Sequence, residues 1–184
     1  MEILIGLAVA ILFAILMYNF LVSRKNQVDN ISASVDALLK KRYDLIPNLV
    51  ASVKEYMEYE KDLLEKVTRL RSKALDRNLD EIQKIETDQE ISRLLGDIFV
   101  AVENYPELKA DKNILHLQHT LNEIEEQISA ARRAYNQAVT DFNNAIEMFP
   151  TNILAKYMGY KRKALFQIDK NQRKSVDVKN LFKS

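Results

Sequence analysis

Apolar residues recur every three or four positions along most of this chain, after an uninterrupted apolar run near its N-terminus. The run, ILIGLAVAILFAILMYNFLV at residues 3–22, contains no charged side chain. As a helix its twenty residues would rise about 30 Å, the thickness of the hydrocarbon core of a bilayer. The alternatives are a core helix and a cleaved signal peptide, but a signal peptide has cations before its apolar run, where this chain has Glu2. The run therefore predicts an uncleaved transmembrane helix.

The first long apolar stripe extends from Val28 to Ala74, and its spacing alternates between three and four residues. Only Arg42 and Glu60 place charged side chains at stripe positions. This spacing puts the apolar residues on one face of a helix, and a stripe of this length is typical of a bundle or a coiled coil.

Two further stripes follow, each with its own helix boundaries. The stripe at residues 91–105 comes after a capping box, Thr87 to Glu90, and stops before Pro106. The stripe at residues 114–149 has Asp111 as its expected N-cap and ends at Pro150. A shorter amphipathic element is expected from Thr151 or Asn152 to Phe166.

These elements predict an all-α protein: an N-terminal transmembrane helix followed by an elongated antiparallel bundle of about four helices. Three Gly and three Pro in 184 residues leave few breaks for a sheet or for many turns. None of the helices can bury its stripe alone, and short connections favour antiparallel neighbours. The predicted division is an anchor at residues 1–23, a helical bundle at residues 24–168 and a basic flexible tail at residues 169–184.

The stretch KKRYDLIPNLV, residues 40–50, interrupts the first stripe with charges and a proline. Pro47 has no amide to bond to the carbonyl of Tyr43, so the helix is expected either to bend or to end and restart. Asp44 is well placed to cap a restarted helix with Pro47 in its first turn. Asp44 and Pro47 are therefore a candidate hinge, with an ordinary proline kink as the alternative.

Charge is distributed unevenly although the net charge is only +1. Residues 156–184 hold nine Lys and Arg against two Asp and Glu, so the C-terminal end is basic and the rest is acidic. Arg24, Lys25 and the cations at residues 40–42 follow the apolar run, which by the positive-inside rule predicts a single-pass membrane protein with its N-terminus outside and the bundle in the cytoplasm.

Surface cations are candidate contacts for binding partners. The alternative is that these side chains are only solvated. A candidate interaction or anionic-lipid surface comprises Arg132, Arg133, Lys161, Arg162, Lys163, Arg173 and Lys174. Asp141 is expected to pair with these arginines or with a cation of the first helix. Asn48, Asn136 and Asn143, next to stripe positions, are expected to make hydrogen bonds that set the register of the bundle.

Catalytic and metal-binding patterns are weak. His116, His119 and Glu123 share one helical face, but that face is nearly opposite the apolar stripe, and bundle metal sites need inward ligands from several helices. The chain has no cysteine, its three glycines are isolated, and neither histidine accompanies a nucleophile on a core-facing position. No catalytic residue, metal site or cofactor is predicted.

Three blocks resemble a known family: RYDLIPNLV, YPELKA, and AARRAYNQAVTDFN ahead of FP. Together they are similar to the LemA family of bacterial membrane proteins over roughly residues 18–165. The resemblance implies a single-pass membrane protein with a soluble bundle of about four helices and no established catalytic residues, and some relatives are associated with magnetosome membrane formation. This chain departs from the family at MGYKRKALF, where a Phe-Gly-Phe-like motif is usual, so its last helix is expected to dock differently.

These features favour a membrane-anchored, non-enzymatic helical bundle that acts as an interaction scaffold or organises membrane. Its expected partners are the bilayer, through residues 3–22, and other membrane-associated proteins or further copies of the chain. Neither nucleic acid nor a small-molecule substrate is predicted. The alternatives are a sensor or signal-relay module acting through Asp44 and Pro47, and a metal-dependent enzyme centred on His116 and His119.

Overall fold

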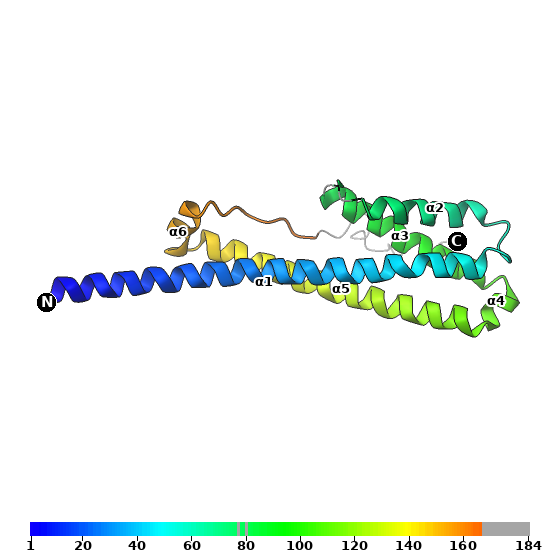
Figure 1. Ribbon diagram of the computed structural model, residues 1–184, viewed down its shortest axis with the longest axis horizontal. Coiled ribbons are helices and arrows are strands. Elements are labelled where there is room, and N and C mark those ends of the chain that lie inside the picture. The colour runs from blue at the N-terminus through cyan, green and yellow to red at the C-terminus, as the bar shows by residue number, and fades with distance from the viewer. Residues whose placement is uncertain (77, 80, 167–184) are drawn as a thin grey trace, which may run out of the picture. The chain divides into compact units, whose positions relative to one another are not determined.

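The computed structural model describes residues 1–76, 78–79 and 81–166, and the regular secondary structure in this part of the chain is all α-helical. The helices are α1 (Glu2–Val53), α2 (Lys61–Ala74), α3 (Glu81–Val102), α4 (Pro106–Ala110), α5 (Lys112–Glu147) and α6 (Thr151–Tyr157) (Figure 1). This confirms the all-α prediction. The described residues form two compact units: residues 26–134, called here the bundle unit, and residues 1–25 with residues 135–166, called the anchor unit.

The division predicted from composition, at residues 23 and 168, stays a prediction. The basic tail at residues 169–184 lies outside the described residues.

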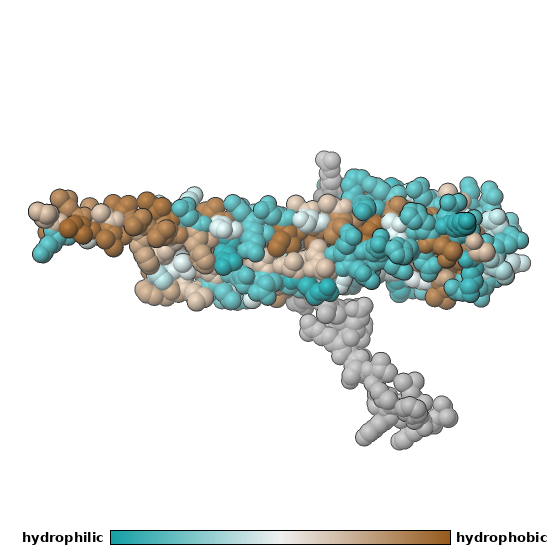
Figure 2. All heavy atoms as spheres, turned by 90° about the horizontal axis from the view of Figure 1, so that it is seen from below, coloured by the Kyte–Doolittle hydropathy of each residue, from teal (hydrophilic) through white to brown (hydrophobic). Residues whose placement is uncertain are grey.

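The N-terminal part of α1 exposes its apolar side chains, including Ile3 (88% exposed) and Phe13 (53% exposed). Among the described helices, α1 alone is long and apolar enough to cross a membrane. Figure 2 shows this end of α1 as a brown, hydrophobic surface. A water-soluble protein rarely leaves so large an apolar surface uncovered, so this part of the helix fits a lipid environment.

Four long helices build the described part of the bundle unit: the part of α1 after residue 25, α2, α3 and the part of α5 before Tyr135, with the short α4 between α3 and α5. Consecutive long helices run in opposite directions (Figure 1), which confirms the antiparallel bundle. Each contributes its stripe to one core, in which each fully buried side chain adds about 1.5–3 kcal/mol. The core includes Ile46, Leu49, Val53, Leu64, Val67, Ile91, Leu94, Ile98, Ile114 and Leu121.

The stripe from Val28 to Ala74 belongs to two helices and not to one, which corrects the prediction. The chain turns between the end of α1 at Val53 and the start of α2 at Lys61. Met57 points inward from this turn and is 1% exposed, and Tyr105 donates a hydrogen bond to Glu60 Oε2 at 2.7 Å. The turn contains neither Gly nor Pro, and inward side chains keep their three-to-four spacing across it.

The start of α3 was predicted too late. Helix α3 begins at Glu81, so Thr87 lies inside it and does not cap it. Thr87 is 2% exposed and the neighbouring Asp88 1% exposed, so both face the interior. The resemblance of TDQE to a capping box is accidental here, because the helix already has a preceding turn and a half.

Helix α5 begins as predicted. Asp111 Oδ1 accepts hydrogen bonds from the amides of Asn113 (2.7 Å) and Ile114 (3.1 Å), which is the geometry of an N-cap. Its C-terminal end at Glu147, before Pro150, also agrees with the prediction.

Helix α6 is shorter than predicted, because it ends at Tyr157 and not near Phe166. Gly159 has a φ of 70°, and the amide of Tyr160 bonds to the carbonyl of Ala155 at 3.0 Å while that of Gly159 bonds to Lys156 at 3.2 Å. These are the two hydrogen bonds of a Schellman motif, which terminates a helix at a left-handed residue.

Two asparagines on α5 hold the non-helical segment at residues 160–166. Asn143 Oδ1 accepts from the amide of Lys163 at 2.9 Å and its Nδ2 donates to the carbonyl of the same residue at 3.0 Å. Asn136 makes the same pair of bonds with Phe166, at 2.8 and 3.0 Å. Seven helical residues rise about 10.5 Å and three extended residues span about 10 Å, so the two clamps match in spacing. The predicted hydrogen bonds exist for Asn136 and Asn143, but their partner is an extended segment and not another helix, and the prediction for the side chain of Asn48 stays a prediction.

Candidate functional site: a buried charge network beside Pro47

Arg42, the charged residue on the first stripe, is 1% exposed and lies at the centre of a polar cluster in the bundle unit. Its guanidinium donates to the carboxylates of Asp88 on α3 and Glu125 on α5. It also donates to Ser92 Oγ at 2.8 Å. A guanidinium offers five donors in one plane, so a single arginine of α1 can bind α3 and α5 at once.

Asp88 is the second centre of this network and is 1% exposed. Besides Arg42, it accepts from Arg132 on α5 and, at 2.9 Å, from the hydroxyl of Tyr43. Arg132 is 24% exposed on its side chain, whereas Glu125 is 45% exposed, so the network reaches solvent on the α5 side.

Burial dominates the electrostatics of the network. It lowers the pKa of Arg42 from its ordinary value, although Glu125 acts in the opposite direction. It also lowers the pKa of Arg132, and it raises the pKa of the Tyr43 hydroxyl against the opposing effect of Arg42. Two arginines and two carboxylates compensate each other in charge, which is the condition for keeping ions inside a bundle.

This arrangement fixes helices relative to one another and offers no obvious chemistry. Every charged group already has a partner of opposite sign within the chain, and the cluster holds no thiol, histidine or lysine that could act as nucleophile or base. Removal of one partner from a buried pair typically costs about 3–5 kcal/mol, so the network specifies which faces of α1, α3 and α5 meet.

Pro47 lies about one turn further along α1, and two effects were predicted for it. Helix α1 continues through Pro47 to Val53, so the end and restart of the helix at this point is wrong, whereas a bend stays a prediction. Asp44 does not cap a helix; it accepts a hydrogen bond from Lys40 at 2.6 Å on the surface. Whether the two residues act as a hinge is a separate question, and that role stays a prediction.

Arg71 of α2 explains how the helix tolerates the proline. Pro47 cannot donate to the carbonyl of Tyr43, and Arg71 Nε donates to that carbonyl instead, at 2.8 Å. The gap left by the proline thus becomes a docking point for α2. Sequence reasoning identified the unpaired carbonyl but missed its partner.

The predicted surface cations fall in different places. Arg133 is exposed and donates to Ser129 Oγ at 2.9 Å, whereas Arg132 is directed into the network. Lys161 and Arg162 are exposed, and Arg162 pairs with Glu147 at 2.8 Å. Lys163 is half-buried, with its ammonium 6.0 Å from the centre of the Phe142 ring. Arg173 and Lys174 lie outside the described residues, and binding of lipid or protein by these cations stays a prediction.

Asp141 forms the predicted pair with the first helix, since it lies 3.7 Å from Arg24 Nη1. Both belong to the anchor unit.

The candidate metal residues lie on the surface. His119 Nδ1 is 3.6 Å from Glu123 Oε1, and both side chains are more than half exposed. Among the described residues, no group of three or more His, Asp and Glu side chains could hold a metal ion.

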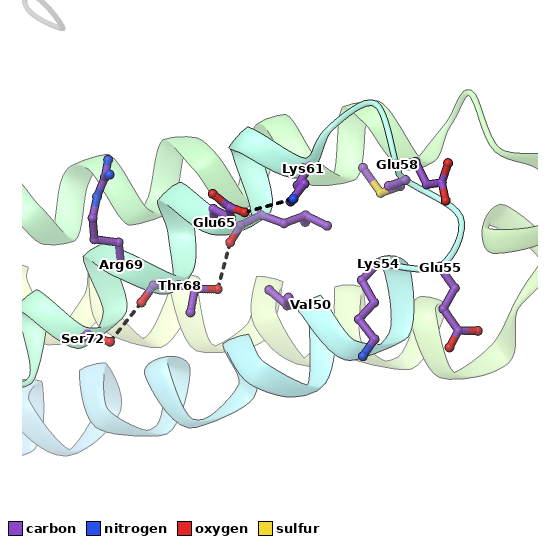
Figure 3. Close-up of a pocket in the computed structure, with 11 residues that line it drawn as sticks. Val50, Lys54, Glu55, Glu58, Lys61, Glu65, Thr68, Arg69 and Ser72 are labelled. Carbon is purple, nitrogen blue, oxygen red and sulfur yellow. Dashed lines mark hydrogen bonds and ion pairs between the residues drawn. The ribbon is translucent and has the colours of Figure 1, made fainter.

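A groove of about 890 Å³ lies between the end of α1 and α2 (Figure 3). Met57, Leu64 and Val50 provide its apolar part. Around them, Lys54, Lys61 and Arg69 alternate with Glu55, Glu58 and Glu65, and the hydroxyls of Thr68 and Ser72 bond to carbonyls of their own helix. Because both charge signs line it equally, the groove shows no preference for a cationic or an anionic ligand.

Fold and site together define a class: an all-helical protein in which, among the described helices, one is long and apolar enough to cross a membrane, with an antiparallel bundle fixed by internal ion pairs. The chain belongs to the LemA family, whose model matches residues 31–180. It is 31% identical to Protein LemA of Metamycoplasma hominis, over 89% of this chain and 74% of that protein.

A second group of relatives carries a different name. The chain is 24% identical to Magnetosome protein MamQ 2 of Paramagnetospirillum magneticum, over 86% of this chain and 68% of that protein. It is also 31% identical to Magnetosome protein MamQ of Magnetospirillum gryphiswaldense, but over only 39% of this chain and 26% of the relative. None of these names denotes an enzyme.

Proposed function

We propose that this protein is a membrane-anchored, non-enzymatic scaffold whose helical bundle binds other proteins or organises the membrane. The observation that carries the proposal is the exposed apolar surface of α1, which continues as the same helix into a bundle with a packed core. The charge network supports it, because its groups serve the fold and are not arranged around a substrate. The magnetosome names of the two MamQ relatives described above support a membrane-related role.

Photo-crosslinking in intact membranes tests the scaffold role. A photoreactive amino acid replaces Arg133, which is exposed on α5, and in a matched variant it replaces Ile128, which is 0% exposed on the same helix. A scaffold should give discrete adducts of higher mass from the first position and not from the second. Recovery of the monomer alone from both positions would count strongly against the proposal.

The proposed orientation places the N-terminus outside the cell and the bundle in the cytoplasm, because cations follow the apolar run and none precedes it. The chain has no cysteine, so a single Gln137→Cys variant provides a unique probe on exposed α5 surface. An impermeant maleimide added to whole cells should not label it until the membrane is opened. Labelling of the variant in intact cells would show that the proposed orientation is wrong.

A signal relay is the second candidate, favoured by the continuity of α1 from its apolar end through Pro47 into the bundle. A relay through this helix predicts that Pro47→Ala changes the crosslinking pattern without destabilising the bundle. An unchanged pattern in a stable variant would remove this candidate.

A further inference from the structure

The C-terminal end of α5 and helix α6 form an apolar corner in the anchor unit that the scaffold role does not use. Four large side chains are exposed there: Met148 (63%), Phe149 (80%), Ile153 (65%) and Tyr157 (91%). Two of them, Ile153 and Tyr157, are four residues apart and share one face of α6. Apolar groups gathered in this way mark a surface that another apolar medium covers.

This corner lies beside the last turns of the apolar run of α1 (Figure 1). Phe20 and Arg24 line one hollow together with Met148, Phe149 and Asp141. Arg24 stacks on the Phe20 ring at 5.2 Å and pairs with Asp141 at 3.7 Å, so α5 is held at this level of α1. Leu21, within the run, is 0% exposed.

The position along α1 gives the depth. Residues 3–22 are needed to cross the hydrocarbon core, and Phe20 is two residues, about 3 Å, from the end of that run. Phe149, which lines the same hollow as Phe20, is therefore at the boundary between hydrocarbon and headgroups. Tyr157 has the amphipathic ring that is enriched at this boundary.

We infer that the corner formed by Met148, Phe149, Ile153 and Tyr157 inserts into the interface of the bilayer that α1 crosses, as a second membrane contact of this chain. Exposed Lys156 and Lys161 adjoin it at the level of the headgroups, where anionic lipids attract cations. The contact holds the end of the apolar run of α1 and the C-terminal end of α5 at one membrane surface. The inference rests on the proposed anchoring by α1.

Single-cysteine variants of the full chain test it, since the native sequence contains no cysteine. An environment-sensitive fluorophore is attached to Ile153→Cys, to Leu12→Cys in the middle of the run, and to Thr140→Cys on exposed α5 surface. Each protein is reconstituted into phosphatidylcholine vesicles containing phosphatidylglycerol. Iodide reports access from water, and lipids carrying a quencher on the headgroup or deep in the acyl chain report contact with the bilayer.

The label at Ile153 should be quenched by the headgroup quencher and should be several-fold less accessible to iodide than the label at Thr140. The label at Leu12 should respond to the deep quencher. Omission of phosphatidylglycerol should weaken quenching of the label at Ile153 by the headgroup quencher, and no change would overturn the part assigned to the lysines.

The variants distinguish failure of the proposed anchor from failure of the proposed membrane contact of the corner. If Leu12 ignores the deep quencher, the anchor itself is refuted. If Leu12 responds while Ile153 behaves like Thr140, only the membrane contact of the corner is refuted. Protection of Ile153 from iodide without quenching by either lipid would assign the corner to a second copy of the protein and would also overturn the inference.

Discussion

The hydrogen bond from Arg71 to the carbonyl of Tyr43 should depend on Pro47, and this dependence can be measured. In the native chain, Arg71→Met leaves a half-buried carbonyl with neither a helical amide nor a guanidinium as donor. Hydrogen bonds of charged groups contribute about 1.5–3 kcal/mol, so the variant should lose about that much stability. With Pro47→Ala in place, residue 47 regains an amide for the same carbonyl, and Arg71→Met should cost less than about 1 kcal/mol.

Pro47→Ala alone should stabilise the bundle. Proline inside a helix is about 3 kcal/mol less favourable than alanine, and the Arg71 bond offsets only part of that difference. The gain should therefore be positive but smaller than about 3 kcal/mol.

Urea unfolding of the full chain in a mild detergent, followed by far-ultraviolet circular dichroism, provides the four free energies of the cycle. Arg69→Met is the matched control, because Arg69 is an exposed arginine two residues away on the same helix. It should change stability by less than about 0.5 kcal/mol with proline or alanine at position 47. Equal costs of Arg71→Met in both backgrounds would refute the proposed exchange of donors.

Three further predictions follow from the polar contacts. Asp88→Ala leaves two arginines without this carboxylate and should lower the free energy of unfolding by about 3–5 kcal/mol, whereas Asp97→Ala breaks an exposed pair and should lower it by less than about 1 kcal/mol. Equal losses of stability on urea unfolding would contradict the buried network. The pKa of Tyr43 is raised above its ordinary value of 10, so Tyr43 contributes stability that is complete below pH 10 and is lost as the pH rises above 10. The urea midpoint of Tyr43→Phe should therefore fall less steeply at alkaline pH than that of the native protein, and parallel curves would show that Tyr43 is not the cause of the alkaline loss. Asn143→Ala should speed tryptic cleavage of the extended segment after α6, whereas Asn144→Ala should not, and equal rates would argue against the clamp.

Helix boundaries were predictable where local chemistry sets them. Asp111 caps α5 with its own side chain, and Pro106 and Pro150 end the elements before them without help from distant residues. The turn between α1 and α2 escaped detection because no local signal marks it: Val53 and Met57 both face the core, so the apolar spacing continues through the reversal. The apolar periodicity indicates which side of the chain faces inward. It does not reveal a change of chain direction after which the same side still faces inward.

The charge network was predictable only in part. The stripe placed Arg42 on the inward face, which implied that it would need a partner. Its partners Asp88 and Glu125 are 46 and 83 residues away, and only the stacking of the helices decides which carboxylates arrive. Asp88 was also assigned to the region of a capping box, since TDQE satisfies that local pattern as well.

Apolar and polar side chains at inward positions contribute differently to the fold: the apolar ones stabilise the bundle, and the polar ones fix its register. Leu, Ile and Val side chains stabilise any register that buries them, because the hydrophobic effect has no direction. The carbonyl left by Pro47, in contrast, accepts the guanidinium of one arginine, and the amide of Asn143 fits the backbone of one residue of the extended segment. A shift of α2 by one turn would keep its apolar contacts but move Arg71 about 5.4 Å away from that carbonyl. Pro47 therefore has a structural role, because it leaves the carbonyl of Tyr43 as the acceptor that fixes where α2 docks.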